Sequence, residues 1–271
     1  MRRIAFVNEK GGTCKTTLAV NLASFLAGRG RRVLLVDLDT QGHAGKSLGI
    51  DVREVEKTTL DLLLDPALPV EDVVLATGVE NLDLVPANKA LADFPIAVAY
   101  DRERELRLAR RLDALSDKYD YAVIDAPPSA GLFITSALIA ATDVVIPVAT
   151  TYLALDGCAE VAGTIERLRS EHGREDLRIA MVVPTLYRKT ALADEVIRKL
   201  GDYFPEQLSK TVLSSSVHLD EAQGHGETIW TYAPGSKGAK MMRALGVELL
   251  ERLEAPAKKA RGSKASQPLH A

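Results

Sequence analysis

The residue types that could do chemistry are concentrated first between Glu9 and Thr17, in the sequence EKGGTCKTT. A short apolar run over 3–8 precedes this stretch, and an amphipathic segment follows it. A strand, a glycine-containing turn and a helix in this order place backbone N–H groups and a helix N-terminus around a phosphate. In such a loop Lys15 would reach the outer phosphates, and the Thr16 hydroxyl would lie on Mg²⁺. The candidate phosphate-binding residues are Lys10, Gly11, Gly12, Thr13, Cys14, Lys15, Thr16 and Thr17.

Carboxylates follow two further predicted strands. The apolar run over 32–37 ends in Asp37, two residues before Asp39, and the run over 121–125 ends in Asp125. Two carboxylates spaced i, i+2 at a strand end can both point at a metal and phosphate edge, where one could orient an attacking water. An aspartate that ends an apolar strand can also hold Mg²⁺, directly or through water. Taken alone, Asp37 and Asp39 could instead cap a strand-to-helix loop, and an aspartate after an apolar strand, such as Asp125, is weak evidence of a metal site.

The elements that must position these residues follow from the pattern of the whole chain. Apolar runs rich in Val, Ile and Leu alternate with helix-period segments, which predicts βαβ units and an α/β fold. We expect a mostly parallel, twisted sheet with helices on both faces, in three layers, because several runs are apolar almost throughout. The expected strands lie at 3–8, 32–37, 82–86, 121–125, 143–148 and 177–183. The expected helices lie at 16–28, 103–116, 132–141, 157–171, 190–203 and 236–253.

Right-handed crossovers place the loops after the parallel strands along one edge of the sheet. The glycine-rich stretch and all three aspartates would therefore meet at that edge. The region over 204–235 is expected to be irregular, with a short strand near 210–213 and a short helix near 219–223.

Composition limits the classes of protein and partner. The 271 residues carry a net charge of −3, so any contact with nucleic acid must come from a local basic patch. The two cysteines, Cys14 and Cys158, form neither a disulfide framework nor a CxxC pair, which is typical of a reduced cytoplasm. We expect no signal peptide and no membrane segment, and hence a cytoplasmic protein. We expect a single domain over 1–255 and a disordered basic tail over 256–271, where the apolar period ends.

The glycine-rich stretch does not match the pattern G-x-x-x-x-G-K-[ST], because Glu9 and Cys14 occupy its two glycine positions. It matches K-G-G-x-x-K-T-T, which resembles the deviant Walker A motif of the ParA/MinD ATPases. The resemblance implies a P-loop NTPase fold over 1–255, with ATP and Mg²⁺ as cofactors. It also implies an ATP-bound homodimer in which Lys10 of each protomer reaches the phosphates of its partner.

Two more segments extend the resemblance. The sequence from Asp37 is similar to the family's D-x-D-P-Q-G, with Thr40 in place of the proline and His43 in place of the usual asparagine. The family's D-x-P-P-S-x-G segment is matched at Asp125, Pro127, Pro128, Ser129 and Gly131. The resemblance implies that Lys10, Lys15 and Asp39 serve catalysis, with Asp39 positioning the water. It implies that Thr16, Asp39 and Asp125 lie at Mg²⁺, Asp125 directly or through water. The segment over 143–157 resembles a core strand and helix entry of the family and is assigned no catalysis.

The short, Soj-like ParA type fits best within the family. The tail lacks the large apolar residues of a membrane-binding helix, and neither cysteine suits an iron–sulfur pair. Members of this type bind DNA non-specifically as ATP dimers, and a ParB-like adaptor stimulates slow hydrolysis. We therefore expect a nucleoid-associated protein whose DNA contacts are electrostatic. The expected DNA-binding residues are Arg188, Lys189, Lys237 and Lys240. Ser215 and His218 stand where the family commonly has arginine, which weakens this expectation.

Alternatives stay open at this point. A ParA-like ATPase could position another cargo, a protein assembly or a septum, without strong DNA binding. A nucleotide-binding scaffold with negligible turnover is a third possibility, against which Asp39 argues, since a static binder needs no water-orienting carboxylate. Cys14 could weaken binding if its loop position needs a positive φ, and a thiol beside Lys15 and a helix N-terminus could be reactive.

Overall fold

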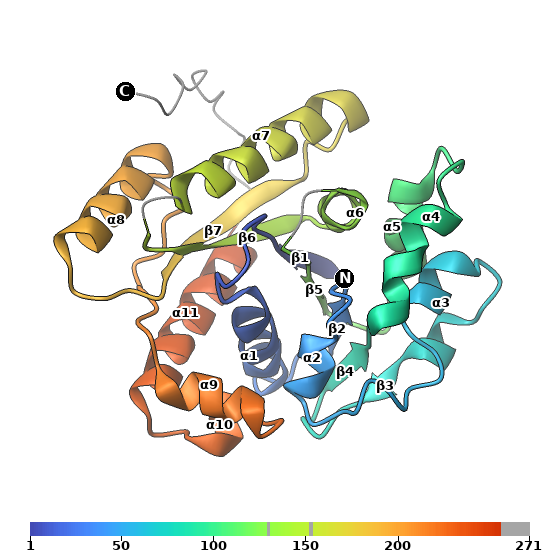
Figure 1. The fold of residues 1–271 in the computed structure, drawn as a ribbon, viewed down its shortest axis with the longest axis horizontal. Helices are drawn as coiled ribbons and strands as arrows, with labels where there is room; N and C mark the ends of the chain where they lie inside the picture. Colours follow the sequence, from blue (N-terminus) through green and yellow to red (C-terminus); the bar gives the residue numbers. More distant parts are fainter. Residues whose placement is uncertain (129–130, 152–153, 256–271) are drawn as a thin grey trace.

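The computed structural model describes residues 1–128, 131–151 and 154–255. Within these residues, one sheet has seven strands in the order β3-β4-β2-β5-β1-β6-β7 (Figure 1). Neighbouring strands pair in parallel, except β3 with β4. The strands are β1 (Arg2–Phe6), β2 (Val33–Asp37), β3 (Leu75–Ala76), β4 (Leu82–Val85), β5 (Tyr121–Asp125), β6 (Asp143–Ala149) and β7 (Arg178–Thr185).

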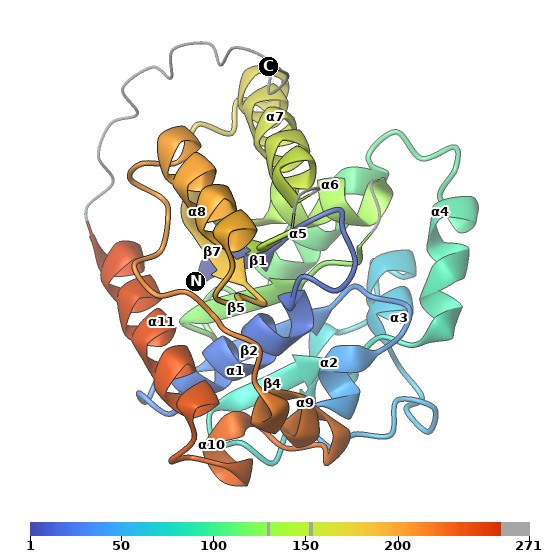
Figure 2. The same ribbon diagram turned by 60° about the vertical axis from the view of Figure 1, so that its left-hand side comes forward.

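Helices cover both faces of the sheet, as Figures 1 and 2 show. The α-helices are α1 (Lys15–Ala27), α2 (His43–Lys46), α3 (Thr59–Leu64), α4 (Phe94–Ala97), α5 (Arg107–Asp113), α6 (Leu132–Ala140), α7 (Ala154–His172), α8 (Ala191–Tyr203), α9 (Val217–Gly224), α10 (Ile229–Tyr232) and α11 (Lys237–Glu254). Short 3₁₀ helices are η1 (Val70–Val73), η2 (Lys89–Asp93) and η3 (Arg104–Leu106). The predicted three-layer α/β fold is confirmed.

The central strands are apolar because both of their faces are buried. In β1 and the residue after it, Ile4 and Phe6 enter the core formed with α1 and α11, whereas Ala5 and Val7 enter the core formed with α5 to α8. All four side chains are fully buried. A strand covered on both sides needs an apolar residue at every central position, so it cannot show the alternation of a half-exposed strand.

The sheet register builds the candidate site. Asp37 and Asp125 are direct neighbours at the ends of β2 and β5, and Phe6 of β1 pairs with Asp125 from the other side. The loops that follow β1, β2 and β5 therefore leave the same edge of the sheet side by side, as the predicted parallel order requires.

The six strands expected for the main sheet are present, with small shifts at their ends. The antiparallel strand β3 was not expected, because two residues are too short to show a period. The helix expected at 103–116 is divided into η3 and α5 and ends at Asp113. Four short helices, α2, α3, α4 and α10, were also not expected, since one or two turns carry little helical periodicity.

The short strand expected near 210–213 is wrong. The backbone N–H of Lys210 donates to both carboxylate oxygens of Glu248 at 3.1 Å instead of to a neighbouring strand. The residues that flank this segment form isolated bridges, Leu208 with Val182 of β7 and Ser214 with Tyr187 after β7, instead of a continuous strand. The predicted tail over 256–271 lies outside the described residues and stays a prediction.

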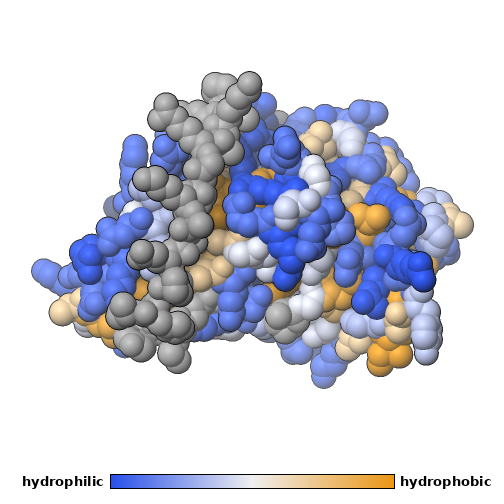
Figure 3. Space-filling model, turned by 90° about the horizontal axis from the view of Figure 1, so that it is seen from above, coloured by the Kyte–Doolittle hydropathy of each residue, from blue (hydrophilic) through white to orange (hydrophobic). Residues whose placement is uncertain are grey.

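The outer surface is largely polar on the side seen in Figure 3, where hydrophobic residues form separate small patches. No described helix has the length and apolar composition needed to cross a bilayer.

Candidate functional site

The loop between β1 and α1 is held in place by side chains from its neighbours. The Asn8 side chain accepts from the Lys10 N–H at 2.9 Å and donates to the Pro147 carbonyl of β6 at 2.7 Å. The Thr185 hydroxyl at the end of β7 donates to the Thr13 carbonyl at 3.1 Å. These anchors were not singled out from the sequence; the only available signal for Asn8 was its place at a strand end. They fix the loop at the carboxyl edge of the sheet, in front of the α1 N-terminus.

Lys15 is the first residue of α1 and is almost fully buried. Its Nζ donates to the Lys10 carbonyl at 2.9 Å, so the ammonium lies against the backbone of the glycine-rich loop. Burial lowers the pKa of Lys15, while the charges of Asp125 and Asp39 oppose that shift. A buried cation that backbone amides and a helix N-terminus surround is suited to an anionic ligand.

Cys14 adopts a left-handed backbone conformation, which favours glycine, with φ 65° and ψ 28°. A residue with a Cβ is strained there by about 1 kcal/mol. Burial, followed by the charge of Asp220, raises the pKa of the Cys14 thiol to about 11, and Thr185 and Lys15 only partly oppose this. The hypothesis of a reactive low-pKa thiol is therefore wrong, because desolvation outweighs the nearby lysine.

Asp37 is fully buried and satisfied by backbone groups. One carboxylate oxygen accepts from the Asp39 N–H at 2.9 Å, and the other accepts from the Ala44 N–H at 3.1 Å. Desolvation, and then repulsion from Asp125, raise the pKa of Asp37 well above its usual value. The expectation that both aspartates of this strand end aim at a metal is therefore not met by Asp37, which instead ties the following loop and α2 to β2.

Asp125 is also fully buried, but in the described part of the chain neither of its oxygens has a hydrogen-bond partner. Desolvation raises its pKa to about 7, and the charge of Asp39 acts in the same direction. Thr16 and Lys15 lower it, although the Thr16 hydroxyl does not reach ordinary hydrogen-bond geometry. A buried carboxylate with free oxygens at a strand end, close to Thr16, has the donor chemistry of a Mg²⁺ site.

Asp39 lies in the loop after β2 and is partly exposed. One of its oxygens accepts from the Gln41 N–H at 2.9 Å, which fixes the carboxylate in the loop. Its charge acts on both Lys15 and Asp125, so the three groups belong to one electrostatic cluster. Among the described residues no group of three His, Cys, Asp or Glu side chains could hold a metal by itself. Mg²⁺ does not need such a cage when one carboxylate, water and substrate phosphates complete its shell.

Lys10 is half-buried at the front of the loop. Its aliphatic stem passes close to Gly157 of α7, where an added Cβ would lie 3.4 Å from Lys10 Cγ and 2.9 Å from Asn8 Oδ1. The role of Lys10 across a dimer stays a prediction. Ser129, the remaining motif residue of the loop after β5, lies outside the described residues.

The basic residues expected to bind DNA are exposed and lie in two places along the chain: Arg188 and Lys189 follow β7, and Lys237 and Lys240 lie in the first turns of α11. In the described part of the chain none of the four forms an ion pair.

The segment before α9 brings the two places together. Tyr187 bridges to Ser214, and its N–H donates to the Leu213 carbonyl at 3.1 Å. At the other end, a Cβ on Gly238 of α11 would lie 2.7 Å from Ser216 Oγ. The loop after β7, the start of α9 and the start of α11 therefore form one continuous stretch of surface, which includes the exposed His218.

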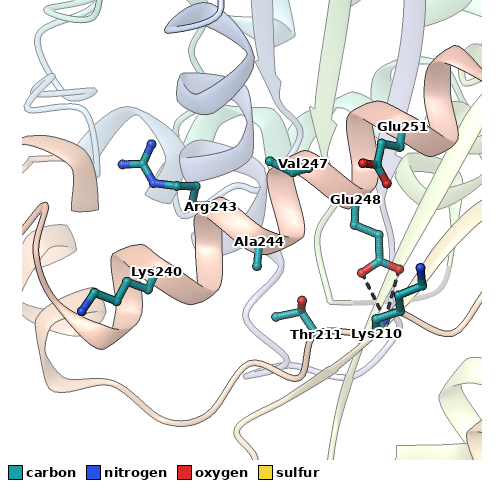
Figure 4. Close-up of a pocket in the computed structure, with 8 residues that line it drawn as sticks. All are labelled: Lys210, Thr211, Lys240, Arg243, Ala244, Val247, Glu248 and Glu251. Carbon is teal, nitrogen blue, oxygen red and sulfur yellow. Dashed lines mark hydrogen bonds between the residues drawn. The ribbon is translucent and has the colours of Figure 1, made fainter.

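Lys240 also borders an open groove of about 480 Å³ beside α11. Figure 4 shows Lys240 and Arg243 on α11, and Lys210 on the facing segment, at the Glu248 end of the groove. None of the predicted nucleotide-binding residues lines this groove.

Comparison with known proteins gives consistent matches over nearly the whole chain. Residues 1–179 match the AAA domain family. The sporulation initiation inhibitor protein Soj of Bacillus subtilis is 44% identical over 247 residues, which cover 91% of this chain and 97% of Soj. The cell division protein PomZ of Myxococcus xanthus is 36% identical over 256 residues, which cover 94% of this chain and 80% of PomZ. The solved structure of cobyrinic acid a,c-diamide synthase from Mycobacterium smegmatis, with bound ADP and magnesium, aligns with a TM-score of 0.79 at 30% identity, over 97% of this chain and 100% of that chain.

Proposed function

The chain belongs to the ParA/Soj family of P-loop ATPases, and from that membership we propose that it is an ATP-driven dimerisation switch that partitions a chromosome region or a plasmid. Its cofactors are ATP and Mg²⁺, which agrees with the ADP and magnesium held by its structural neighbour. The observation that carries the proposal is the cluster at the sheet edge. There Lys15 is buried in the loop, Asp125 is buried without a hydrogen-bond partner, and Asp39 is fixed beside them.

Phosphoryl transfer to water needs positioning and charge stabilisation more than covalent chemistry. In the proposed mechanism the loop amides and Lys15 would hold the β- and γ-phosphates, and Thr16 and Asp125 would hold Mg²⁺, whose charge would stabilise the phosphate oxygens. Asp39 orients a water for attack on the γ-phosphorus. The bond to the bridging oxygen breaks as the bond to water forms, giving ADP and inorganic phosphate.

The switch depends on the second protomer. Lys10 of each protomer reaches the phosphates of its partner, so the dimer is stable while ATP is intact and dissociates after hydrolysis. A ParB-like adaptor stimulates this otherwise slow step. The similarity to Soj and the exposure of Gly11 and Gly12, directly after the half-buried Lys10, support this assignment.

The ATP-bound dimer binds non-specific DNA through the continuous surface formed by the loop after β7 and the starts of α9 and α11. Arg188, Lys189, Lys237 and Lys240 supply positive charge that is free of ion pairs in the described part of the chain. Contacts of this kind neutralise phosphates and release counterions, so binding should weaken steeply with salt. The protein would then be associated with the nucleoid.

An electrophoretic shift with non-specific duplex DNA tests the proposal. We expect a shift with ATP and Mg²⁺ that is absent with ADP and weakens at moderate salt. Arg188→Ala should weaken binding, because it removes a phosphate contact. Arg198→Ala is the matched control, since Arg198 is an exposed arginine on α8 that already pairs with Asp202. Equal binding with ATP and ADP would contradict the proposal.

A second function deserves the same test, because PomZ is a cell division protein and is 36% identical to this chain. In this alternative the ATPase positions a protein assembly or septum, through another adaptor and without strong DNA binding. The presence of Ser215 and His218 where arginines are common favours it. A normal ATP-induced dimer that leaves DNA unshifted would select this alternative.

A further inference from the structure

A chain of side-chain hydrogen bonds connects the phosphate-loop helix to α9 and then to α2. The Thr17 hydroxyl of α1 donates to Gln223 Oε1 of α9 at 3.3 Å. Gln223 Nε2 donates to Ser47 Oγ, directly after α2, at 3.4 Å. The Ser47 hydroxyl donates in turn to the His43 carbonyl at 2.7 Å. Figures 1 and 2 both show α1, α2 and α9 grouped on one side of the sheet.

These hydrogen bonds lie largely away from water, and their donors and acceptors follow one order from Thr17 to His43. Thr17 and Ser47 are buried, and Gln223 is half-buried. Because each hydroxyl has one proton, the direction of every bond depends on the bond before it. A buried polar network of this kind holds its elements in one arrangement only while every member keeps a partner.

A backbone contact joins the same two regions independently. Gly49 follows α2 and Gly226 follows α9, both with positive φ. A Cβ on Gly226 would lie 2.7 Å from Gly49 Cα, so only glycine allows the two loops to meet this closely. The end of α9 is therefore packed directly against the segment that follows the Asp39 loop and α2.

We propose that Gln223 is a positioning residue through which nucleotide occupancy is transmitted to α9. The Thr17 hydroxyl can donate its proton to Gln223 or to a phosphate oxygen, but not to both. A bound nucleotide whose phosphate oxygen accepts the hydrogen bond from Thr17 breaks the bond between Thr17 and Gln223. The anchoring of α9 is then weaker. The hydrogen bond between Thr17 and Gln223 is therefore present when the phosphate loop is empty and absent when a nucleotide is bound. This difference gives the free-energy difference through which nucleotide binding can act on α9.

The consequence for DNA rests on the proposed function. α9 begins at Val217, carries the exposed His218 and abuts the start of α11 at Gly238. A change in the anchoring of α9 would therefore alter the surface assigned to DNA.

The test is hydrogen–deuterium exchange of the α9 amides, with and without ADP and Mg²⁺. In the proposed function ADP does not close the dimer, and no DNA is present, so the readout does not depend on either step. The variants are Gln223→Met, which keeps the side-chain length but removes both hydrogen bonds of Gln223, and Ser47→Ala, which keeps the bond from Thr17 to Gln223 but removes the bonds from Gln223 to Ser47 and from Ser47 to His43. Glu221→Gln is the matched control, because Glu221 is an exposed residue of α9 whose side chain accepts a hydrogen bond from Tyr232 OH at 3.3 Å and is not part of the Thr17–Gln223–Ser47 series.

We expect ADP to speed α9 exchange in the wild type by about fivefold or more, the lower end of ordinary coupling. In Gln223→Met and Ser47→Ala the empty protein should already exchange fast, and ADP should add little. Glu221→Gln should behave as the wild type. If Gln223→Met does not fold, Ser47→Ala alone decides. An ADP response that survives in the variants, or a wild type whose α9 ignores calorimetrically verified ADP binding, would overturn the inference. Failure of the DNA shift would overturn the proposed function alone.

Discussion

At the scale of single residues, the site is defined by how burial acts on charge. Asp37 and Asp125 end neighbouring strands and are both fully buried, yet they differ in their partners. Backbone N–H groups satisfy Asp37, whereas Asp125 has none in the described part of the chain. The sequence predicted the position of both aspartates at the edge. It could not predict this division of roles, because the bonds to Asp37 depend on how the following loop folds back over β2.

The titration of Asp125 gives a pH dependence of stability in the metal-free protein. Its pKa is raised from 3.8 to about 7 in the folded state. Between these values the folded chain keeps a proton that the unfolded chain releases, so the free energy of unfolding falls as the pH rises. Above about pH 7 the loss of unfolding free energy is complete, and it is on the order of 4 kcal/mol at about 1.4 kcal/mol per pKa unit. Asp37 shifts in the same direction.

Urea unfolding at about pH 5 and about pH 8 should therefore show the metal-free protein to be more stable at the lower pH. Asp125→Asn should flatten this dependence and stabilise the protein at the higher pH. Mg²⁺ with ATP should also flatten it, because ligand binding requires the ionised carboxylate. Greater stability of the wild type at the higher pH would contradict the assigned burial of an unpaired Asp125.

The left-handed backbone of Cys14 gives a second residue-scale prediction. Cys14→Gly should be more stable than Cys14→Ala by about 1 kcal/mol, because glycine adopts this conformation without a Cβ penalty while alanine does not. Both variants lose the thiol, so the difference between their free energies of unfolding reports the cost of placing a Cβ in this backbone conformation. Denaturant unfolding measures it. Alanine equal to or better than glycine would mean that the loop does not require the positive φ.

At the scale of elements, the long helices and strands were predictable, and the short ones were not. β1, β2 and β5 show near-continuous apolar runs, and α8 and α11 show a clear helical period. The helix α10 has only four residues, and tertiary contacts hold it in place. The Ile229 N–H donates to Asn21 Oδ1 at 2.8 Å, and Trp230 Nε1 donates to the Asn21 carbonyl at 3.0 Å. No local pattern encodes such contacts between residues about two hundred positions apart.

Asn21 therefore carries an element-scale prediction. Asn21→Ala leaves the buried Ile229 N–H without its acceptor, which should cost about 1–3 kcal/mol of unfolding free energy. Thr228→Ala is the matched control, because the Thr228 hydroxyl is equally buried but has no partner in the described residues. The fluorescence of Trp230, the chain's single tryptophan, reports on the same junction. Similar losses in the two variants would contradict the role given to Asn21.

At the scale of the whole molecule, one sheet edge carries the proposed nucleotide site, and the C-terminal elements carry the surface proposed to bind DNA. The parallel order of the strands made the first part predictable, since the carboxyl ends of β1, β2 and β5 must meet. For the C-terminal surface, the sequence predicted which basic residues contribute but not how they are arranged. That the loop after β7 lies beside the segment before α9 follows from the bridge between Tyr187 and Ser214, which replaced the strand expected near 210–213.

We propose that ATP closes a dimer and that hydrolysis at Asp39 opens it again. The most direct measurement is the molar mass in solution of wild type and Asp39→Ala, with Mg²⁺ and either ATP or ADP, together with phosphate release. Asp39→Ala should bind ATP, release almost no phosphate and remain a dimer, while the wild type returns to monomer as ATP is consumed. With ADP both should be monomers. Unchanged phosphate release by Asp39→Ala, or a wild type that stays monomeric with ATP, would contradict a dimer switch driven by hydrolysis at Asp39.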